Sequence, residues 1–294
     1  MALYYCYQCK RSLSVKGTFY LSFDISDGKE RLSVTWFVDK DPSTYSRKFL
    51  KMQISKKGEF YNVISVDSIV DGSQIPVDSP LNNLEITSKV SISEVLNLIG
   101  DLRKDLSPAY KEFLSKSRLY ALFEQYSKYP AGLSVHHDIQ GGLLQHVFEM
   151  LQGLKSFMTI PYLSNVQWGQ CIIAIIYHDY GKLVEYDQES WNITPEYPLL
   201  GHIYISANFV NNGLIIHNND GQNPFTKREI ECIVHCILAH HMNKEWGSPV
   251  VPATMEATIV HYLDMLSARA YMFSHTQDMQ ANKWIGTTVI KNTI

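Results

Sequence analysis

The sequence has no long run of apolar residues. Its longest uninterrupted apolar stretch, Cys171–Tyr177, has seven residues, whereas a helix that crosses a bilayer needs about 20. The first residues, Met-Ala-Leu-Tyr-Tyr-Cys, lack the basic segment followed by an apolar segment that marks a secretory signal. We therefore expect no membrane-spanning helix and a cytoplasmic location.

Cysteine is scarce and odd in number. Three of the five cysteines, Cys171, Cys232 and Cys236, lie inside apolar stretches where a small buried thiol is the usual explanation. A disulfide framework is therefore not expected. Cys6 and Cys9 form a CxxC pair, but a single pair is a weak zinc signal. Two structural cysteines are the favoured interpretation, unless another chain supplies further ligands.

Neither sign of charge is in strong excess. The 294 residues carry 26 Lys and Arg against 29 Asp and Glu, which disfavours a protein that coats nucleic acid non-specifically. Residues 1–70 hold 11 basic against 7 acidic side chains, and residues 71–294 hold 15 against 22. This asymmetry suits a binding module joined to a metal-using one, although a solvated surface gives a similar imbalance.

The N-terminal residues alternate between apolar and polar side chains, which is typical of strands. Phe19–Ile25 and Arg31–Val38 follow this pattern on either side of Ser26-Asp-Gly-Lys29, and an Asp-Gly pair in that place predicts a hairpin turn. Short strands are also predicted over residues 49–54 and 60–66. Among small barrels and sandwiches, the oligonucleotide-binding (OB) barrel has about this number of strands.

Beyond the predicted strands, the pattern changes to helical spacing. Helical spacing runs from Val90 to Tyr126, and four further helices are predicted over 142–158, 166–179, 226–241 and 254–272. The expected fold class is thus α+β with two domains. We place an OB-like barrel at 1–72, a linker rich in Gly, Pro, Ser and Asn at 73–90, an all-α domain at 91–280 and a tail at 281–294.

Histidine and aspartate residues fall at the ends and apolar faces of the predicted helices. His178-Asp179 closes the most apolar helix, and because an unpaired buried carboxylate is expensive, we expect a metal ion to compensate it. Other candidate ligands in similar places are His146, His202, His240, His241 and Asp264. Helical spacing puts His241 on the apolar stripe and turns His240 about 100° away from it. Each histidine alone is more often a core residue, but the ordered set favours a metal site.

The series His…His-Asp…Asp resembles the signature of the HD superfamily of metal-dependent phosphohydrolases. More closely, several segments resemble the YhaM-type 3′-to-5′ exoribonucleases of Gram-positive bacteria, in which an OB barrel precedes the HD domain. These segments are 129–137, 141–146, 178–182, 199–202, 239–241, 245–249 and 261–268. Tyr180 departs from the family pattern, since an aliphatic residue is more usual in this place.

The resemblance implies a site with two divalent metal ions. The first metal would be held by His146, His178, Asp179 and Asp264, and the second by Asp179 as a bridge, His202, His240 and His241. Mixed nitrogen and oxygen ligands suit manganese, which we expect first, or Fe, Co, Ni or Zn, better than calcium. Two such ions can clamp the attacking and leaving oxygens of a phosphodiester.

The resemblance also suggests contacts to substrate. Asp179 and Lys182 are the candidate catalytic residues, and Lys182 is the first candidate for a phosphate contact, although a cation at a helix C-terminus is an equal explanation. Arg269 is a second phosphate candidate or a solvated side chain. His136 and His137, in a loop, either meet substrate or are merely exposed.

The predicted barrel offers cations and aromatic faces for single-stranded nucleic acid. The candidates are Tyr20, Arg31, Phe37, Lys48, Lys51, Lys56, Lys57 and Tyr61. Base stacking on aromatic side chains tolerates any sequence, but an ordinary solvated sheet face explains the lysines as well.

We therefore expect a metal-dependent phosphodiesterase, a 3′-to-5′ exonuclease that degrades single-stranded RNA or DNA to nucleoside 5′-monophosphates. One alternative is an HD-type hydrolase of a small nucleotide or cyclic dinucleotide. Another is a non-catalytic single-strand-binding protein with a vestigial site, against which the complete ligand set argues. The expected partner is single-stranded nucleic acid and not a membrane, and a homo-oligomer is compatible with the sequence.

Overall fold

The chain folds into two compact units in a computed structural model that describes residues 1–133, 135–195, 197–276 and 279–291. The first unit comprises Met1–Ile86 together with Tyr186–Thr194, and the second comprises Thr87–Glu185 with Pro195–Ile294.

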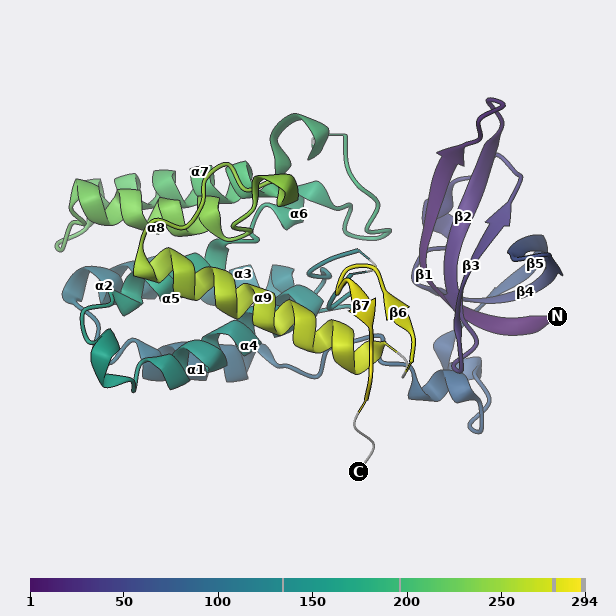
Figure 1. Cartoon of the computed structure of the whole chain (residues 1–294), viewed down its shortest axis with the longest axis horizontal. Helices are drawn as coiled ribbons and strands as arrows, with labels where there is room; N and C mark the ends of the chain where they lie inside the picture. Colours follow the sequence, from purple (N-terminus) through teal and green to yellow (C-terminus); the bar gives the residue numbers. More distant parts are fainter. Residues whose placement is uncertain (134, 196, 277–278, 292–294) are drawn as a thin grey trace. The chain divides into compact units, whose positions relative to one another are not determined.

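The first unit is a five-stranded closed barrel (Figure 1). Its strands are β1 (Ala2–Leu13), β2 (Phe19–Ser26), β3 (Arg31–Trp36), β4 (Lys48–Lys57) and β5 (Phe60–Val70). The strand order is β1-β2-β3-β5-β4, with β1 pairing to both β2 and β4, and β3 pairing to β5 in parallel. This topology confirms the predicted OB-like barrel, and the helices of the second unit confirm the α+β two-domain class.

The hairpin prediction is confirmed, but β1 was missed. At the turn between β2 and β3, Gly28 has φ +92°, and Asp27 Oδ1 accepts hydrogen bonds from the N–H groups of Lys29 and Glu30. In β1 the register shifts between Cys6 and Gln8. Such a bulge breaks the alternation of apolar and polar residues that identifies a strand in a sequence.

Cys6 and Cys9 lie in the core of the barrel. Both are fully buried beside apolar side chains such as Leu21 and Phe23, and burial raises the pKa of both thiols, that of Cys9 to about 12. A protonated, buried thiol is a small apolar side chain and not a metal ligand. The structure thus supports the interpretation of this pair as structural cysteines.

Much of the segment expected as a linker packs within the barrel unit. Ile75 and Leu81 form a buried cluster with Tyr5, and the backbone of Pro80 passes so close to Gly28 that a Cβ there would lie 2.4 Å from it. The boundary between the units falls after Ile86. At the other end of the chain, β6 (Ala281–Asn282) and β7 (Thr287–Thr288) form a hairpin within the expected tail, of which residues 292–294 lie outside the described part.

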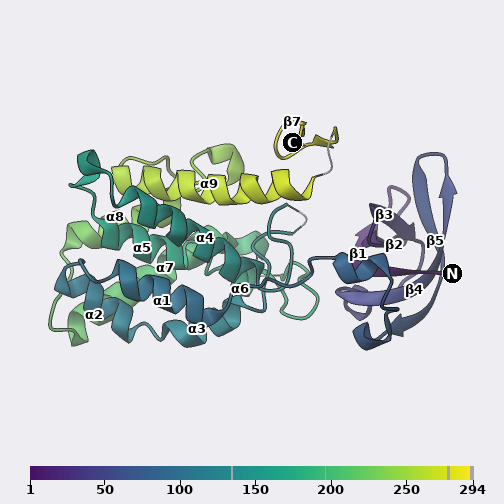
Figure 2. The same cartoon turned by 90° about the horizontal axis from the view of Figure 1, so that it is seen from below.

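The second unit is helical. Its elements are α1 (Ile92–Leu102), α2 (Pro108–Lys116), α3 (Leu119–Tyr126), α4 (Gly142–Phe157), α5 (Trp168–Tyr177), α6 (Lys182–Glu185), α7 (Tyr197–Asp220), α8 (Lys227–Ala239) and α9 (Met255–His275). Every residue of the apolar stretch Cys171–Tyr177 is buried, because α5 packs against α4, α8 and α9 (Figure 2). The predicted capping box is present at α8, where Thr226 and Glu229 exchange hydrogen bonds.

Helix α7 was not predicted from the sequence. Its apolar residues are interrupted by Asn, Gly and His, so it has neither an amphipathic stripe nor a continuous apolar run. The stretch Leu199–Asp220 is nevertheless long and apolar enough, by length and composition alone, to cross a membrane, which a count of uninterrupted apolar residues overlooked. In this structure α7 packs against α8, and near its end His217 and Asn218 bond to the backbone of Asn223 and Phe225.

Candidate metal centre

The predicted ligands come from five places in the second unit and converge. They are His146 on α4, His178 and Asp179 at the end of α5, His202 on α7, His240 and His241 after α8, and Asp264 on α9. Their ligand atoms form overlapping groups within 4.8 Å: His146, His178 and Asp264; His178, Asp179 and His240; and His202, His240 and His241. His146, His178 and His240 are fully buried, and Asp179 is 2% exposed.

Each histidine of this centre is held through Nδ1. The Nδ1 atoms of His178, His240 and His241 donate to the backbone carbonyls of Ile175, Ile237 and Trp246, at 3.0, 2.7 and 2.7 Å. His202 Nδ1 lies 2.7 Å from Glu185 Oε2. Carbonyl and carboxylate oxygens only accept hydrogen bonds, so each Nδ1 carries the proton and each neutral ring keeps a lone pair on Nε2.

His146 also carries its proton on Nδ1, because Ser267 links this nitrogen to Glu149. Ser267 Oγ donates to Glu149 Oε2 at 2.7 Å, so it accepts from His146 Nδ1 at 2.9 Å. His146 Nε2 therefore faces Asp264 Oδ1 at 3.0 Å with a lone pair when the ring is neutral. Two acceptors at this distance repel each other unless a cation or a proton lies between them.

Several buried polar atoms of the centre have no hydrogen-bond partner. Among the described residues, these atoms are His178 Nε2, Asp179 Oδ1, His202 Nε2 and His240 Nε2. Asp179 Oδ1 lies 3.7 Å from His202 Nε2 and 3.9 Å from His240 Nε2. An unsatisfied buried polar group costs about 1–3 kcal/mol, and imidazole and carboxylate are the ligands that divalent transition metals prefer. The residues present therefore fit a metal ion.

The charges of the centre act on one another. Burial alone would raise the pKa of Asp179 and Asp264, but the neighbouring histidines, and for Asp179 also Lys182, hold both far below the ordinary value. Burial and the other imidazoles lower the pKa of His240, whereas for His178 the neighbouring Asp179 outweighs burial and raises the pKa. Carboxylates that stay ionised and imidazoles that stay neutral are the forms that bind metal.

Lys182 is buried beside Asp179 and is not an exposed phosphate contact. Its Nζ lies 2.7 Å from Asp179 Oδ2 and also donates to the backbone carbonyl of Ala131. Lys182 thereby joins Asp179 to the loop that carries His136 and His137. The expected contact of Lys182 with substrate stays a prediction, and the contact with Ala131 is one that the sequence could not show.

The loop pair His136 and His137 is more buried than expected. His137 is fully buried with φ +46°, and its Nε2 lies 3.0 Å from Glu149 Oε2. His137 Nδ1 is 3.1 Å from His136 Nδ1, and the two rings form a potential ligand group with His146. Gly142 lets the backbone of His137 lie close to the start of α4, because a Cβ at position 142 would lie 1.9 Å from the His137 carbonyl oxygen.

Three residues around the centre were missed in the sequence. Ser267 contacts Nδ1 of His146, and Glu185 contacts Nδ1 of His202. Glu149 contacts Nε2 of His137, which lies beside His146. Glu149 accepts from Gln145 and Ser267 as well, and these contacts lower its pKa to about 2 although burial opposes this. A glutamate three residues after a predicted ligand histidine is one helical turn away, which is the signal that could have identified it. Arg269, by contrast, is exposed on α9.

The predicted nucleic-acid contacts on the barrel fall into two sets. Tyr20, Phe37 and Lys57 line one surface cavity of about 640 Å³, together with Leu13, Ser14, Val15, Thr35, Phe60 and Asn62. The rings of Tyr20 and Phe37 are 5.6 Å apart, and Phe37 and Phe60 are 62% and 76% exposed. Lys56 lies over the ring of Tyr61 at 5.2 Å.

Five of the eight candidates lie outside that cavity, namely Lys56, Tyr61, Arg31, Lys48 and Lys51. Arg31 forms a two-bond ion pair with Asp24 and stacks over Tyr7, so its charge is already engaged. Lys51 lies 3.8 Å from Asp67, and Lys48 is exposed.

The chain is similar in sequence to known exoribonucleases of the YhaM type. The chain is 29% identical over 211 residues to the 3′-5′ exoribonuclease YhaM of Bacillus pumilus (strain SAFR-032). The matched region covers 71% of this chain and 63% of the relative, so it leaves more than a third of the relative unmatched. No family model and no solved structure matches the chain. The similarity confirms the resemblance to YhaM-type proteins.

Proposed function

We propose that the chain is a metal-dependent 3′-to-5′ exonuclease that hydrolyses single-stranded RNA and releases nucleoside 5′-monophosphates. The main support for the proposal is that the Nε2 atoms of several histidines converge with the carboxylates of Asp179 and Asp264. Four buried atoms of this centre have no hydrogen-bond partner among the described residues. The named activity of the relative supports the choice of substrate.

We assign two divalent ions to the centre, with manganese as the first choice. His146, His178 and Asp264 would hold one ion, His202, His240 and His241 would hold the other, and Asp179 would contact both. When bound, such ions stabilise charge on a phosphodiester and lower the pKa of water towards neutrality. Lys182 holds Asp179 by its second oxygen, and Glu185 and Ser267 keep the ring orientations of His202 and His146.

The barrel cavity favours a polymeric substrate over a small nucleotide. Its exposed aromatic faces and Lys57 border the turns β1–β2 and β4–β5, where OB barrels bind oligonucleotides. Base stacking on such faces is worth about 1–3 kcal/mol per base. A hydrolase of cyclic dinucleotides would not need such a surface, because its substrate is small enough to bind at the metal centre alone.

The direct test is a time course with 5′-labelled single-stranded RNA and Mn²⁺. We expect a ladder that shortens from the 3′ end, nucleoside 5′-monophosphates as products, and no cleavage of a cyclic dinucleotide. The same strand as DNA measures the sugar preference. Cleavage of the small nucleotide with an intact RNA strand would replace the proposal by the alternative hydrolase.

Removing the aromatic faces of the barrel should weaken binding of long strands. For the double variant Tyr20→Ala/Phe37→Ala we expect single-stranded RNA affinity to fall by about 10-fold or more, because stacking of one to two bases is lost. Lys57→Glu should also reduce the salt dependence of binding. Cleavage of a dinucleotide should be unchanged in both. Tyr162→Ala, which removes an 82% exposed ring from the helical unit, is the control; an equal loss there would contradict the assignment.

Glu149 should matter although it is not a metal ligand. Glu149 Oε2 accepts from Ser267 and lies 3.0 Å from His137 Nε2, whereas Oε1 accepts from Gln145. In Glu149→Gln an uncharged amide replaces the carboxylate, so the contacts that orient the His146 and His137 rings are weakened. We expect turnover or Mn²⁺ affinity to fall by about 10- to 100-fold. Gln145→Ala removes only a donor to Glu149 and should stay near wild type. Wild-type turnover and metal affinity in Glu149→Gln would refute this role.

A further inference from the structure

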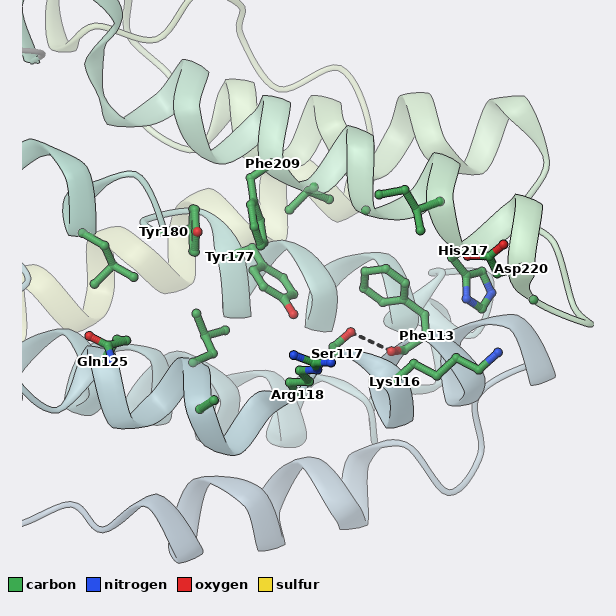
Figure 3. A pocket seen from close by; sticks show the side chains of 17 residues that line it. Phe113, Lys116, Ser117, Arg118, Gln125, Tyr177, Tyr180, Phe209, His217 and Asp220 are labelled. Carbon is green, nitrogen blue, oxygen red and sulfur yellow. Dashed lines mark hydrogen bonds between the residues drawn. The ribbon is translucent and has the colours of Figure 1, made fainter.

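The helical unit contains a cavity that the metal centre does not use (Figure 3). It has a volume of about 480 Å³ and lies between α2 and α3 on one side and α7 on the other. Cavities of about 300–1,000 Å³ are typical of sites for small organic molecules. The cavity is therefore large enough for a ligand of its own.

The walls of the cavity are mainly apolar and aromatic. Tyr180 stacks on Phe209 at 3.8 Å with an angle of 18° between the rings, and Phe113 and Tyr177 add two further rings. Figure 3 shows Tyr177 between Phe209 and Ser117, with side chains from α7 facing those of α2 and α3. A wall of this kind favours a ligand with an apolar body.

The polar groups at the rim favour a negative head on that ligand. Arg118 lines the cavity, and within the described part of the chain its guanidinium makes no ion pair. Lys116 also lines it but is already paired with Glu112 at 2.6 Å. The one carboxylate in the lining, Asp220, lies beside His217 in Figure 3, apart from Arg118. Arg118 is thus the cation available for an anionic group.

One short turn connects this cavity to the metal centre. Within residues 177–183, Tyr177, Tyr180 and Leu183 line the cavity, whereas His178, Asp179 and Lys182 belong to the metal centre. In this turn the N–H groups of Tyr180, Lys182 and Leu183 donate to the carbonyls of Tyr177, Asp179 and Tyr180, and the N–H of Gly181 donates to Ser206 Oγ. Any molecule that packs against Tyr180 and Leu183 therefore also stabilises the backbone that presents Asp179.

We propose that this cavity binds a small amphipathic anion, with its apolar chain between α3 and α7 and its charged head at Arg118, and that this ligand strengthens metal binding through the turn 177–183. The second part rests on the proposed metal centre, and the first part does not. A fatty-acid-like carboxylate or an alkyl sulfonate has the required chemistry. Because coupling between two sites is reciprocal, bound metal should strengthen ligand binding by the same factor.

The test uses the full chain and three probes that share a ten-carbon tail. Calorimetry with decanesulfonate, decanol and decyltrimethylammonium measures whether the chain binds the tail and which head it prefers. We expect decanesulfonate to bind most tightly, and Arg118→Gln to weaken it by about 10-fold while leaving decanol unchanged. We also expect decanesulfonate to lower the Kd for Mn²⁺ by about 5-fold, a typical coupling between sites.

A variant that fills the cavity tests whether the probes bind inside it. A Cβ on Gly213 would meet only Phe113, at 3.9 Å, so Gly213→Leu fits and improves the helix propensity of α7. It should abolish binding of both decanesulfonate and decanol. Asn212→Leu, an exposed neighbour outside the cavity lining, adds the same side chain on the surface and should bind like wild type.

The outcomes separate this inference from the proposed function. No binding of decanesulfonate, binding that survives Gly213→Leu, or a preference for the cationic probe would overturn the cavity assignment, even in an active nuclease. An unchanged Kd for Mn²⁺ would overturn the coupling. Tight binding of decanesulfonate in a chain that binds no metal would leave the cavity assignment standing and remove the metal centre instead.

Discussion

Asp179→Asn is expected to reduce hydrolysis by about 10³-fold or more and to lower the bound metal, while single-stranded RNA still binds. Asp179 is the residue that faces His178, His202 and His240 together, at 3.1–3.9 Å. A neutral amide removes the charge that would balance two cations, and metal ions contribute several kcal/mol to such reactions. RNA affinity should stay close to wild type, because the proposed binding surface is on the barrel.

A second variant distinguishes a loss of activity caused by the missing carboxylate from one caused by misfolding. Asp179→Asn leaves the buried ammonium of Lys182 without its counter-ion, and an unpaired buried charge destabilises a protein. Asp179→Asn/Lys182→Met removes both charges and should fold with a melting temperature closer to wild type, yet remain inactive. Turnover at the wild-type rate in either variant would show that Asp179 is not part of the reacting centre.

Single ligand replacements should remove one metal at a time. His146→Ala and His202→Ala alter different ligand groups, so each should reduce the metal content from two ions per chain to one and lower turnover by about 10²-fold or more. Elemental analysis of the purified variants gives the metal count, and a labelled RNA gives the rate. Loss of both ions in both variants would instead indicate a single shared site.

His235→Gln provides the matched control for these replacements. This histidine lies on α8, five residues before His240, and accepts a hydrogen bond from the N–H of Ala253 instead of facing the cluster. The variant should keep two ions per chain and near-normal turnover.

The sequence predicted which histidines and aspartates converge better than it predicted the residues around them. His146, His178 and Asp264 were found because a polar residue on an apolar helix face needs compensation, and this local pattern is visible without a structure. His240 was placed away from the apolar stripe by helical spacing, yet it is fully buried. The reason is that α8 packs against α5, α7 and α9, so more than one face of this helix is covered.

The partners of these ligands could not be predicted, since they depend on contacts between distant segments. Ser267 meets His146 across 121 residues, and Lys182 reaches the carbonyl of Ala131 across 51. Glu185 approaches His202 because Gly181 lets the α7 backbone come close; a Cβ there would lie 2.3 Å from the His202 carbonyl oxygen. Only the packing of α4, α7 and α9 reveals these positioning contacts.

In the barrel, too, local features were predicted from the sequence and contacts between distant segments were not. The turn at Asp27-Gly28 was predicted from two residues, whereas β1 was missed because a bulge breaks its alternation. The parallel pairing of β3 with β5, which gives the barrel its topology, joins residues 27 positions apart in the chain, Val34 with Tyr61. No local pattern encodes that pairing.

The most direct test of the central claim is anomalous diffraction from crystals of the Mn²⁺-loaded chain. We expect two manganese peaks roughly 3.5–4 Å apart, one beside His146, His178 and Asp264, the other beside His202 and His240, and both in contact with Asp179. A single peak, a pair away from Asp179, or no manganese in this cluster would contradict the dinuclear centre on which the proposed reaction depends.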